Sequence, residues 1–246
     1  MSLFCRGDVV LVTGTDTGVG KTWIGCALVR ALRAEGRSVS VRKPAETGCL
    51  SRDGELYPAD AALLREAAGA GESLADVCGV RLAEPLAPAV AAARAGAVIE
   101  PAAIVAEIAA ASRRFDLVVV EGAGGLLVPL SGRYGYADLA RDLGARLILV
   151  VGARLGAINA TLLTLEVAAA RGLPVAGLVV NHFAATEDLA TRTLAASLRH
   201  LTDVPVLAEV AQGEDPATRL RDLAQLAPRR TPPVKDRTSP SGPLER

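Results

Sequence analysis

The feature that most constrains the fold of this chain is a glycine-rich turn between an apolar run and a helix-like segment. Residues 14–22 read Gly-Thr-Asp-Thr-Gly-Val-Gly-Lys-Thr and follow the apolar run 9–12. A buried strand, a glycine-rich turn and a helix, in this order, form the layout of a phosphate-binding loop. In such a loop backbone amides surround the anion, Lys21 reaches the outer phosphates and the Thr22 hydroxyl holds a magnesium ion. The sequence therefore predicts a nucleotide-binding domain.

The predicted loop is one residue longer than the common pattern. Thr15 stands where the first glycine of that pattern belongs, and Gly14 lies one position further back, whereas the Gly-Lys-Thr end is intact. The alternative interpretation is a plain strand-to-helix turn with a chance lysine. That alternative gives no reason for Gly18 and Gly20, which flank Val19 and make the turn unusually mobile.

The charge balance argues against a nucleic-acid partner. The 246 residues include 27 acidic and 27 basic side chains, and only 3% are aromatic. Nucleic-acid-binding proteins usually carry a basic excess or aromatic stacking platforms. The sequence has no run approaching the roughly 20 apolar residues of a membrane helix, and its start lacks a signal-peptide pattern. We expect a cytoplasmic protein that binds neither nucleic acid nor membrane.

The cysteines do not form a metal-binding pattern. The sequence contains four of them, widely and irregularly spaced, together with only two histidines. Zinc sites usually show close Cys or His pairs at regular spacing. We therefore expect free thiols rather than zinc ligands at Cys5, Cys26, Cys49 and Cys78.

Short apolar runs alternate with segments of helical periodicity along most of the chain. Val-, Ile- and Leu-rich runs without polar alternation are typical of parallel strands covered on both faces, and they occupy residues 8–13, 38–42, 117–121, 146–151, 175–180 and 204–208. Helices are predicted over 21–35, 101–114, 157–171 and 187–201. This order predicts a single α/β domain over residues 1–227, with a mostly parallel sheet flanked by helices on both faces. The Pro-rich segment 228–246 is predicted to be a disordered tail.

Polar residues follow several predicted strands at their carboxyl ends, where ligands gather in parallel sheets. Lys43 follows the second strand, on the rim of the phosphate-binding loop, and can neutralise charge on a transferring phosphoryl group. The alternative is a hydrated strand-end lysine. Thr47 offers a hydroxyl over the same cleft. Glu121 ends the third strand, where a carboxylate can bind magnesium, and the next residues, 122–125, read Gly-Ala-Gly-Gly and allow a phosphate to approach the backbone.

Three further positions have both a structural and a functional interpretation. Asp60 opens a predicted helix, where an N-cap or first-turn acid is the ordinary explanation. Residues 152–159 follow a buried strand and begin a helix, and free amides at such a start suit a carboxylate. Asn181 ends the next strand, and its amide suits a purine edge, although a plain turn asparagine explains it nearly as well.

Together these motifs resemble those of the dethiobiotin synthetases, the ATP-dependent ring-closing enzymes of biotin biosynthesis. The resemblance covers residues 8–225 and is carried by four segments in the family's order and spacing: 12–22, 42–48, 120–125 and 151–159. The longer phosphate-binding loop is itself a feature of that family. The resemblance implies a P-loop NTPase-like fold. It also implies that 7,8-diaminononanoate, CO2 and ATP react, with magnesium present, to give dethiobiotin, ADP and phosphate through a carbamate and a carbamic-phosphoric anhydride.

The resemblance also implies roles for individual residues. Lys43 is then the catalytic lysine, with Lys21 in support, and magnesium is held by Thr22, Asp60 and Glu121. The implied ATP-binding positions are Gly18, Val19, Gly20, Lys21, Thr22, Asp60, Glu121, Gly122, Ala123, Gly124, Asn181, Ala211, Gln212 and Gly213. The implied substrate-binding positions are Thr17, Lys43, Thr47, Leu155, Gly156, Ala157, Ile158 and Asn159, and the last five serve the neighbouring subunit of a homodimer.

The sequence departs from the family pattern in three places. Arg154 stands where lysine is expected, and Ala89 replaces a residue that is often histidine. Val210 and Ala211 stand where the family commonly has a proline near the adenine. This last departure bears on the predicted nucleotide contact of residues 211–213.

Three rival functions are built on the same kind of loop. A partitioning or septum-positioning ATPase carries a signature lysine at the position of Asp16, together with a DNA- or membrane-binding surface that this sequence lacks. An amide-forming ligase of the cobyrinate type needs a glutaminase domain, for which too few residues follow position 225. An idle nucleotide-binding module does not account for Lys21, Thr22, Lys43 and Glu121 together.

Overall fold

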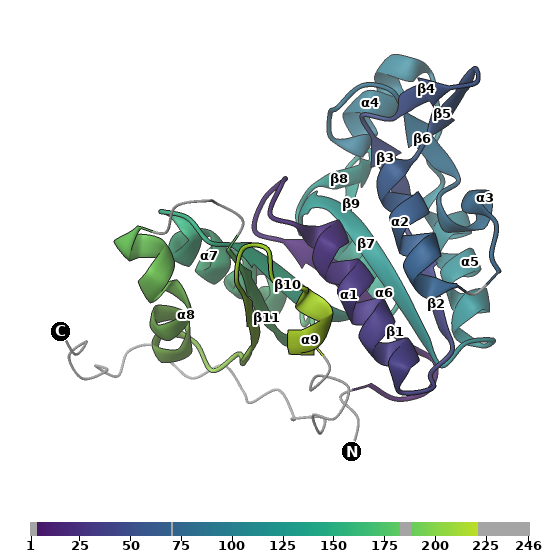
Figure 1. The fold of residues 1–246 in the computed structure, drawn as a ribbon. Coiled ribbons are helices and arrows are strands. Elements are labelled where there is room, and N and C mark those ends of the chain that lie inside the picture. The colour runs from purple at the N-terminus through teal and green to yellow at the C-terminus, as the bar shows by residue number, and fades with distance from the viewer. Residues whose placement is uncertain (1–3, 70, 183–187, 221–246) are drawn as a thin grey trace.

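A parallel sheet of six strands forms the centre of the molecule. The computed structural model describes residues 4–69, 71–182 and 188–220, and Figure 1 shows their arrangement. The strands lie in the order β12-β11-β10-β1-β7-β2, and all neighbouring pairs are parallel. Their bounds are β1 Asp8–Gly14, β2 Val39–Arg42, β7 Leu117–Gly125, β10 Arg146–Gly152, β11 Val175–Asn181 and β12 Val206–Val210. All six predicted strands are therefore present, and the predicted fold class is confirmed.

Helices bury both faces of this sheet. In β1, Val10 and Val12 belong to the core on one face, beneath α1 (Lys21–Ala34), α2 (Ala59–Ala68) and α9 (Pro216–Leu220). Successive residues of a strand point to opposite faces, so Val9 and Leu11 belong to the core of the other face. That second face is covered by α5 (Pro101–Ser112), α6 (Tyr136–Asp142), α7 (Ala157–Ala170) and α8 (Leu189–Leu201). Two covered faces explain why the strands lack polar alternation.

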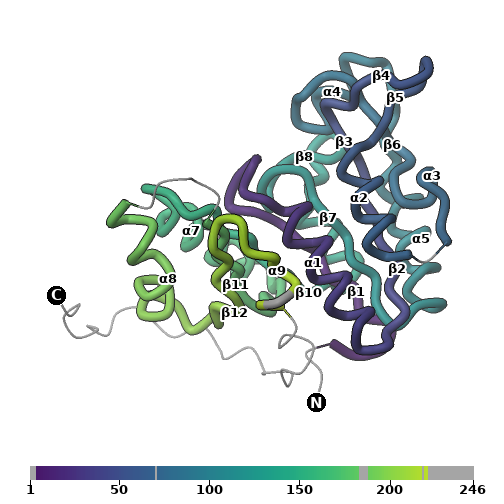
Figure 2. The backbone as a smooth tube through the Cα atoms, viewed as in Figure 1, coloured from purple at the N-terminus to yellow at the C-terminus, as the bar shows by residue number. Residues whose placement is uncertain are grey.

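The chain between β2 and β7 builds a small region that extends past one end of the large sheet (Figures 1 and 2). This region contains the parallel pair β3 (Ala45–Thr47) and β6 (Val80–Leu82), the antiparallel pair β4 (Leu50–Arg52) and β5 (Glu55–Tyr57), and α4 (Pro88–Ala95). The short helix α3 (Leu74–Val77) instead packs beside α2 and β2. A further antiparallel pair joins β8 (Pro129–Ser131) to β9 (Tyr134–Gly135). The sequence pattern does not predict these strands, because two or three residues are too few to show periodicity.

Most predicted boundaries agree with the structure to within two residues, but β7, predicted over 117–121, continues to Gly125. The last strand of the sheet was predicted over 204–208 but spans Val206–Val210. Pro205 precedes it and has no N–H to give to the ladder, although its carbonyl accepts a hydrogen bond from the Leu178 amide at 2.8 Å. The four predicted helices correspond to α1, α5, α7 and α8. Residue 187, the predicted start of the last one, and the predicted tail 228–246 lie outside the described residues.

Within the described ranges, no helix combines the length and the apolar character needed to cross a membrane.

Candidate active site

The predicted phosphate-binding loop joins β1 to α1 at the carboxyl edge of the sheet. Gly18 and Gly20 have positive φ angles of 75° and 91°, a conformation that glycine adopts without strain. A Cβ atom at Gly18 would meet no atom of the described structure within 4 Å, so the space over this part of the loop is open. Gly20 is the N-cap of α1 and offers no side chain to the first amides of the helix. An open loop followed by uncapped helix amides suits an anion.

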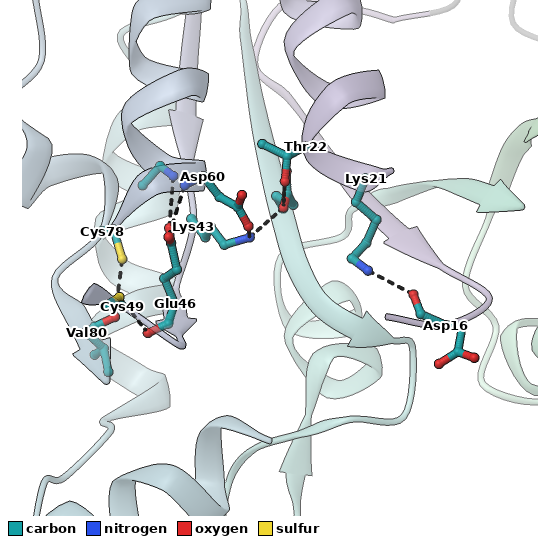
Figure 3. Close-up of polar contacts among 11 residues, drawn as sticks. Asp16, Lys21, Thr22, Lys43, Glu46, Cys49, Asp60, Cys78 and Val80 are labelled. Carbon is teal, nitrogen blue, oxygen red and sulfur yellow. Dashed lines mark hydrogen bonds and ion pairs between the residues drawn. The ribbon is translucent and has the colours of Figure 1, made fainter. Parts of the chain in front are cut away.

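Four predicted site residues meet where β2, β7, α1 and α2 converge (Figure 3). The Lys43 ammonium nitrogen Nζ donates hydrogen bonds to Asp60 Oδ2 at 2.9 Å and to Glu121 Oε1 at 2.5 Å. The Thr22 hydroxyl donates to the same Glu121 oxygen at 2.8 Å. The side chains of Lys43 and Glu121 are 5% and 1% exposed, whereas that of Asp60 is 44% exposed. We call these four residues the Lys43 cluster.

The two lysines of the site have opposite electrostatic surroundings. Burial lowers the pKa of Lys43, but the carboxylates of Glu121 and Asp60 outweigh that effect and raise its pKa above 10.5. For Lys21 burial is the largest effect, and its pKa lies below 10.5. Figure 3 shows the two lysines on either side of Thr22, with the Lys21 ammonium donating to the backbone carbonyl of Asp16 at 3.0 Å. Lys43 is thus paired with carboxylates, whereas Lys21 is bonded to the loop itself.

The oxygen atoms of the Lys43 cluster fit the magnesium ion that the sequence predicts. Magnesium prefers hard oxygen ligands such as carboxylates and hydroxyls and usually takes only a few from the protein. Glu121 Oε2 is buried and has no hydrogen-bond partner in the described part of the chain. Thr22, Asp60 and Glu121 would hold the ion. The set contains only two carboxylates, and no group of three or more His, Cys, Asp or Glu that could hold a metal occurs among the described residues.

The glycine-rich end of β7 brings two more predicted positions together. A Cβ atom at Gly122 would lie 3.3 Å from the ring of Tyr136, so this buried ring packs directly on the strand. Gly124 has a positive φ of 63°, and a Cβ there would lie 3.4 Å from the Thr17 hydroxyl oxygen. Ala123 lies between the two glycines in β7. The end of β7 and the phosphate-binding loop are therefore neighbours at Thr17.

The predicted base side of the site lies at the ends of β11 and β12. Asn181 is buried, and its side-chain amide donates to the Val19 carbonyl at 2.9 Å, which ties β11 to the phosphate-binding loop. The exposed residues 211–213 follow β12, whose last residue is paired with Asn181. A cavity of about 540 Å³ lies here, and its lining includes His182, Arg192, Glu209 and Ala211. The adenine contacts of Asn181, Ala211, Gln212 and Gly213 remain a prediction.

The predicted substrate-carboxylate segment lies on the Asp16 side of the phosphate-binding loop. Arg154 forms an ion pair with Asp16, although both side chains are about half exposed. The backbone amide of Thr17 and the Arg154 guanidinium lower the pKa of the Asp16 carboxyl. Gly156 is the left-handed N-cap of α7, and Leu155 beside it is 83% exposed. Residues 155–159 thus flank the loop opposite the Lys43 cluster, and their substrate role remains a prediction.

The predicted hydroxyl of Thr47 belongs to the region beyond the end of β2. Thr47 ends β3 and is partly exposed. Glu46, which precedes it, is a residue of this site that the sequence pattern did not predict. Its two carboxylate oxygens accept hydrogen bonds from the backbone amides of Asp60 and Ala61. The available signal was the N-cap position of α2, where Pro58 has no side chain that can accept a hydrogen bond.

Known proteins resemble this chain over most of its length. The family model described as an AAA domain matches residues 8–217. An ATP-dependent dethiobiotin synthetase from Anaeromyxobacter dehalogenans is 46% identical over 88% of this chain and 96% of its own length. A protein of the same name from Aromatoleum aromaticum is 45% identical over 84% of this chain and 92% of its own length.

Solved structures share the fold at low sequence identity. The cell-division ATPase MinD of Pyrococcus furiosus has a TM-score of 0.55 at 16% identity, covering 89% of this chain and 97% of that one. A cobyrinic acid a,c-diamide synthase from Mycobacterium smegmatis also has a TM-score of 0.55, at 19% identity, covering 89% of this chain and 93% of that one. These likenesses concern the fold alone, whereas the identity to the curated relatives extends across the whole domain. The chain therefore belongs to the family of ATP-dependent dethiobiotin synthetases.

Proposed function

We propose that this protein converts 7,8-diaminononanoate, CO2 and ATP into dethiobiotin, ADP and phosphate. The observation that carries the proposal is the Lys43 cluster, which lies beside a phosphate-binding loop in a chain 46% identical to a named dethiobiotin synthetase. One substrate amine adds to CO2, loses a proton and forms a carbamate. The carbamate attacks the γ-phosphorus of ATP, and ADP leaves. The second amine then attacks the carbamic-phosphoric anhydride, releases phosphate and closes the cyclic urea.

The protein contributes mainly position and charge to this reaction. Holding two amines, a carbamate and a phosphoryl group in line supplies several kcal/mol. Lys43 and Lys21 provide cationic donors at the place where negative charge spreads over the phosphoryl oxygens. Magnesium, held by Thr22, Asp60 and Glu121, would supply further positive charge to the phosphates. In the absence of substrates Lys43 is kept protonated by its two carboxylate partners.

We also propose that the active form is a homodimer with the substrate site at the subunit interface. The start of α7 supports this arrangement, because Gly156 leaves the first helix amides without a side-chain cap, and such amides suit a carboxylate. Leu155 at the same place is 83% exposed, as expected for a residue that a second subunit covers. Sedimentation analysis of the purified protein tests the oligomeric state.

The reaction is tested by a single incubation of purified protein with magnesium-ATP, isotopically labelled bicarbonate and the diamine. We expect mass spectrometry to find a cyclic urea that carries the label, with one phosphate released for each urea formed. Omission of the diamine or of bicarbonate should abolish phosphate release. Phosphate release that depends on DNA or lipid instead of these substrates would refute the proposal and favour a partitioning-type ATPase.

The role of Lys43 has its own test. Lys43→Ala removes one preorganised cationic donor, and we expect turnover to fall about 100-fold or more. A loss of less than about threefold, far below the usual effect of such a donor, would exclude Lys43 from the phosphoryl-transfer step. Steady-state rates at saturating ATP and diamine distinguish this effect from weaker binding.

A further inference from the structure

The helix that carries Asp60 is capped by a residue from another element. The N-cap position of α2 is Pro58, which makes no side-chain hydrogen bond to the helix. Glu46 of β3 takes over this role: its Oε1 accepts from the Asp60 amide at 3.0 Å and its Oε2 from the Ala61 amide at 2.9 Å. A carboxylate is well suited to this position, because helix N-termini carry partial positive charge and charge-assisted hydrogen bonds are strong.

Burial differs sharply between the two acids. Glu46 is buried, with 6% of the residue exposed, whereas the Asp60 side chain is 44% exposed. Packing therefore does little to fix the Asp60 carboxylate. Its position depends on the hydrogen bond from Lys43 and on the position of the Asp60 backbone, whose amide donates to Glu46. Figure 3 shows Glu46 reaching up to the first turn of α2 beside Lys43.

Glu46 also lies close to Lys43 along the chain. The two residues are separated only by Pro44 and Ala45, and the proline fixes one backbone angle of that short link. The same four-residue segment thus supplies the cation that bonds the Asp60 side chain and the anion that bonds the Asp60 amide. Both hydrogen bonds of Asp60, the one to its side chain and the one from its backbone amide, are therefore made with residues that follow the end of β2.

We infer that Glu46 is a positioning residue, which holds the start of α2 so that the Asp60 carboxylate faces Lys43, Glu121 and a magnesium-bound nucleotide. The inference rests on the proposed function, because it assigns Glu46 a purpose within that same site. Residues that orient metal ligands from outside the coordination shell typically change metal affinity by 10- to 100-fold when they are replaced. We therefore expect Glu46→Ala to raise the magnesium concentration needed for tight nucleotide binding by about tenfold or more.

The test is an equilibrium measurement that does not depend on turnover. ADP affinity is measured by calorimetry at a series of Mg²⁺ concentrations for the wild-type chain, Glu46→Ala, Asp60→Ala and the double variant. If Glu46 acts through Asp60, both single variants weaken the magnesium enhancement, and the double variant resembles Asp60→Ala alone. Effects that simply add in the double variant, or an unchanged magnesium enhancement in Glu46→Ala, would overturn the inference.

A matched control separates positioning from general loss of a helix cap. Asp188 caps α8 by accepting from the Thr191 amide at 2.8 Å, so Asp188→Ala removes a carboxylate helix cap away from the Lys43 cluster. We expect this variant to keep the wild-type magnesium enhancement, and a shift equal to that of Glu46→Ala would count against the inference. Should Glu46→Ala fail to fold, Glu46→Gln keeps one acceptor oxygen and should show a smaller shift in the same direction.

Failure of the inference and failure of the proposed function can be told apart. Labelled cyclic urea formed by the wild-type chain tests the reaction, whatever the variants do. If that product forms and Glu46→Ala binds ADP with the wild-type magnesium dependence, only the inference is lost. If the wild-type chain binds ADP without any magnesium enhancement, the inference and the proposed magnesium site fall together.

Discussion

Replacing Lys43 by methionine should destabilise the protein as well as inactivate it. The substitution removes the cation from a pair whose side chains are 5% and 1% exposed and leaves the Glu121 carboxylate buried. Removing one partner of a buried ion pair typically costs about 3–5 kcal/mol. The Thr22 hydroxyl still donates to Glu121 at 2.8 Å. The Asp60 carboxylate is 44% exposed, so water can replace its hydrogen bond from Lys43 at little cost in free energy. We therefore expect a loss near the lower end, about 3 kcal/mol, which corresponds to a fall of roughly 6–12 °C in melting temperature for a chain of this size.

The assay is denaturant unfolding followed by circular dichroism, without nucleotide or magnesium. Adding Glu121→Gln to Lys43→Met removes the stranded charge, so the double variant should recover about 2 kcal/mol of the lost unfolding free energy while remaining inactive. Lys21→Met is the matched control. Lys21 is bonded to a backbone carbonyl, and burial lowers its pKa, so its removal should change stability by less than about 1 kcal/mol.

Two results would refute this reasoning. The unfolding free energy of Lys43→Met could lie within about 1 kcal/mol of the wild-type value, an ordinary effect for a substitution. That result would mean that the buried ion pair contributes little to stability. Alternatively, the double variant could be no more stable than Lys43→Met. In that case the loss would come from packing of the lysine stem and not from the uncompensated Glu121 carboxylate.

Two further predictions concern the loop glycines and the cysteines. Gly20→Ala should weaken ADP binding about tenfold or more, because a left-handed backbone costs an alanine about 1–2 kcal/mol and its Cβ would collide with the Asn181 amide. Gly18→Ala has the same backbone strain but open space around its Cβ, so calorimetry should show a smaller loss for it. Native-state alkylation at pH 8, followed by peptide mass spectrometry, should label the exposed Cys5 before Cys78, since burial raises the pKa of Cys78 to about 12 and a raised pKa leaves less reactive thiolate.

The strands were predictable because most of them are apolar runs without polar alternation, as expected when both faces of a sheet are covered. That single signal placed all six strands of the sheet and, through the rule that ligands gather at carboxyl ends, placed Lys43 and Glu121 on one edge. Asp60 was predicted to open a helix, and the structure has α2 begin one residue earlier, at Ala59. The short strands β3 to β6 gave no such signal. The local sequence pattern was therefore sufficient to predict the buried strands of the central sheet, but not the short strands outside it.

The contacts inside the site could not be predicted in the same way. Glu121 lies 78 residues after Lys43 in the sequence, and the 2.5 Å contact between them depends on how β2 pairs with β7. Asn181 likewise reaches Val19 across 162 residues. Glu46 escaped notice because a capping residue is normally sought next to its helix, and this one comes from another element. The residue types of the site were readable from the sequence, whereas its connections required the fold.

The hydrogen bond from Asn181 to Val19 bears on how the enzyme distinguishes one nucleoside triphosphate from another. Asn181 lies on the predicted base side, whereas Val19 lies between the glycines of the phosphate-binding loop. If a bound base displaces the Asn181 amide, we expect the predicted phosphate-binding loop to shift with it. We expect nucleoside triphosphates to differ more in turnover than in binding affinity, because a poorly matched base would misalign the γ-phosphoryl group that is transferred.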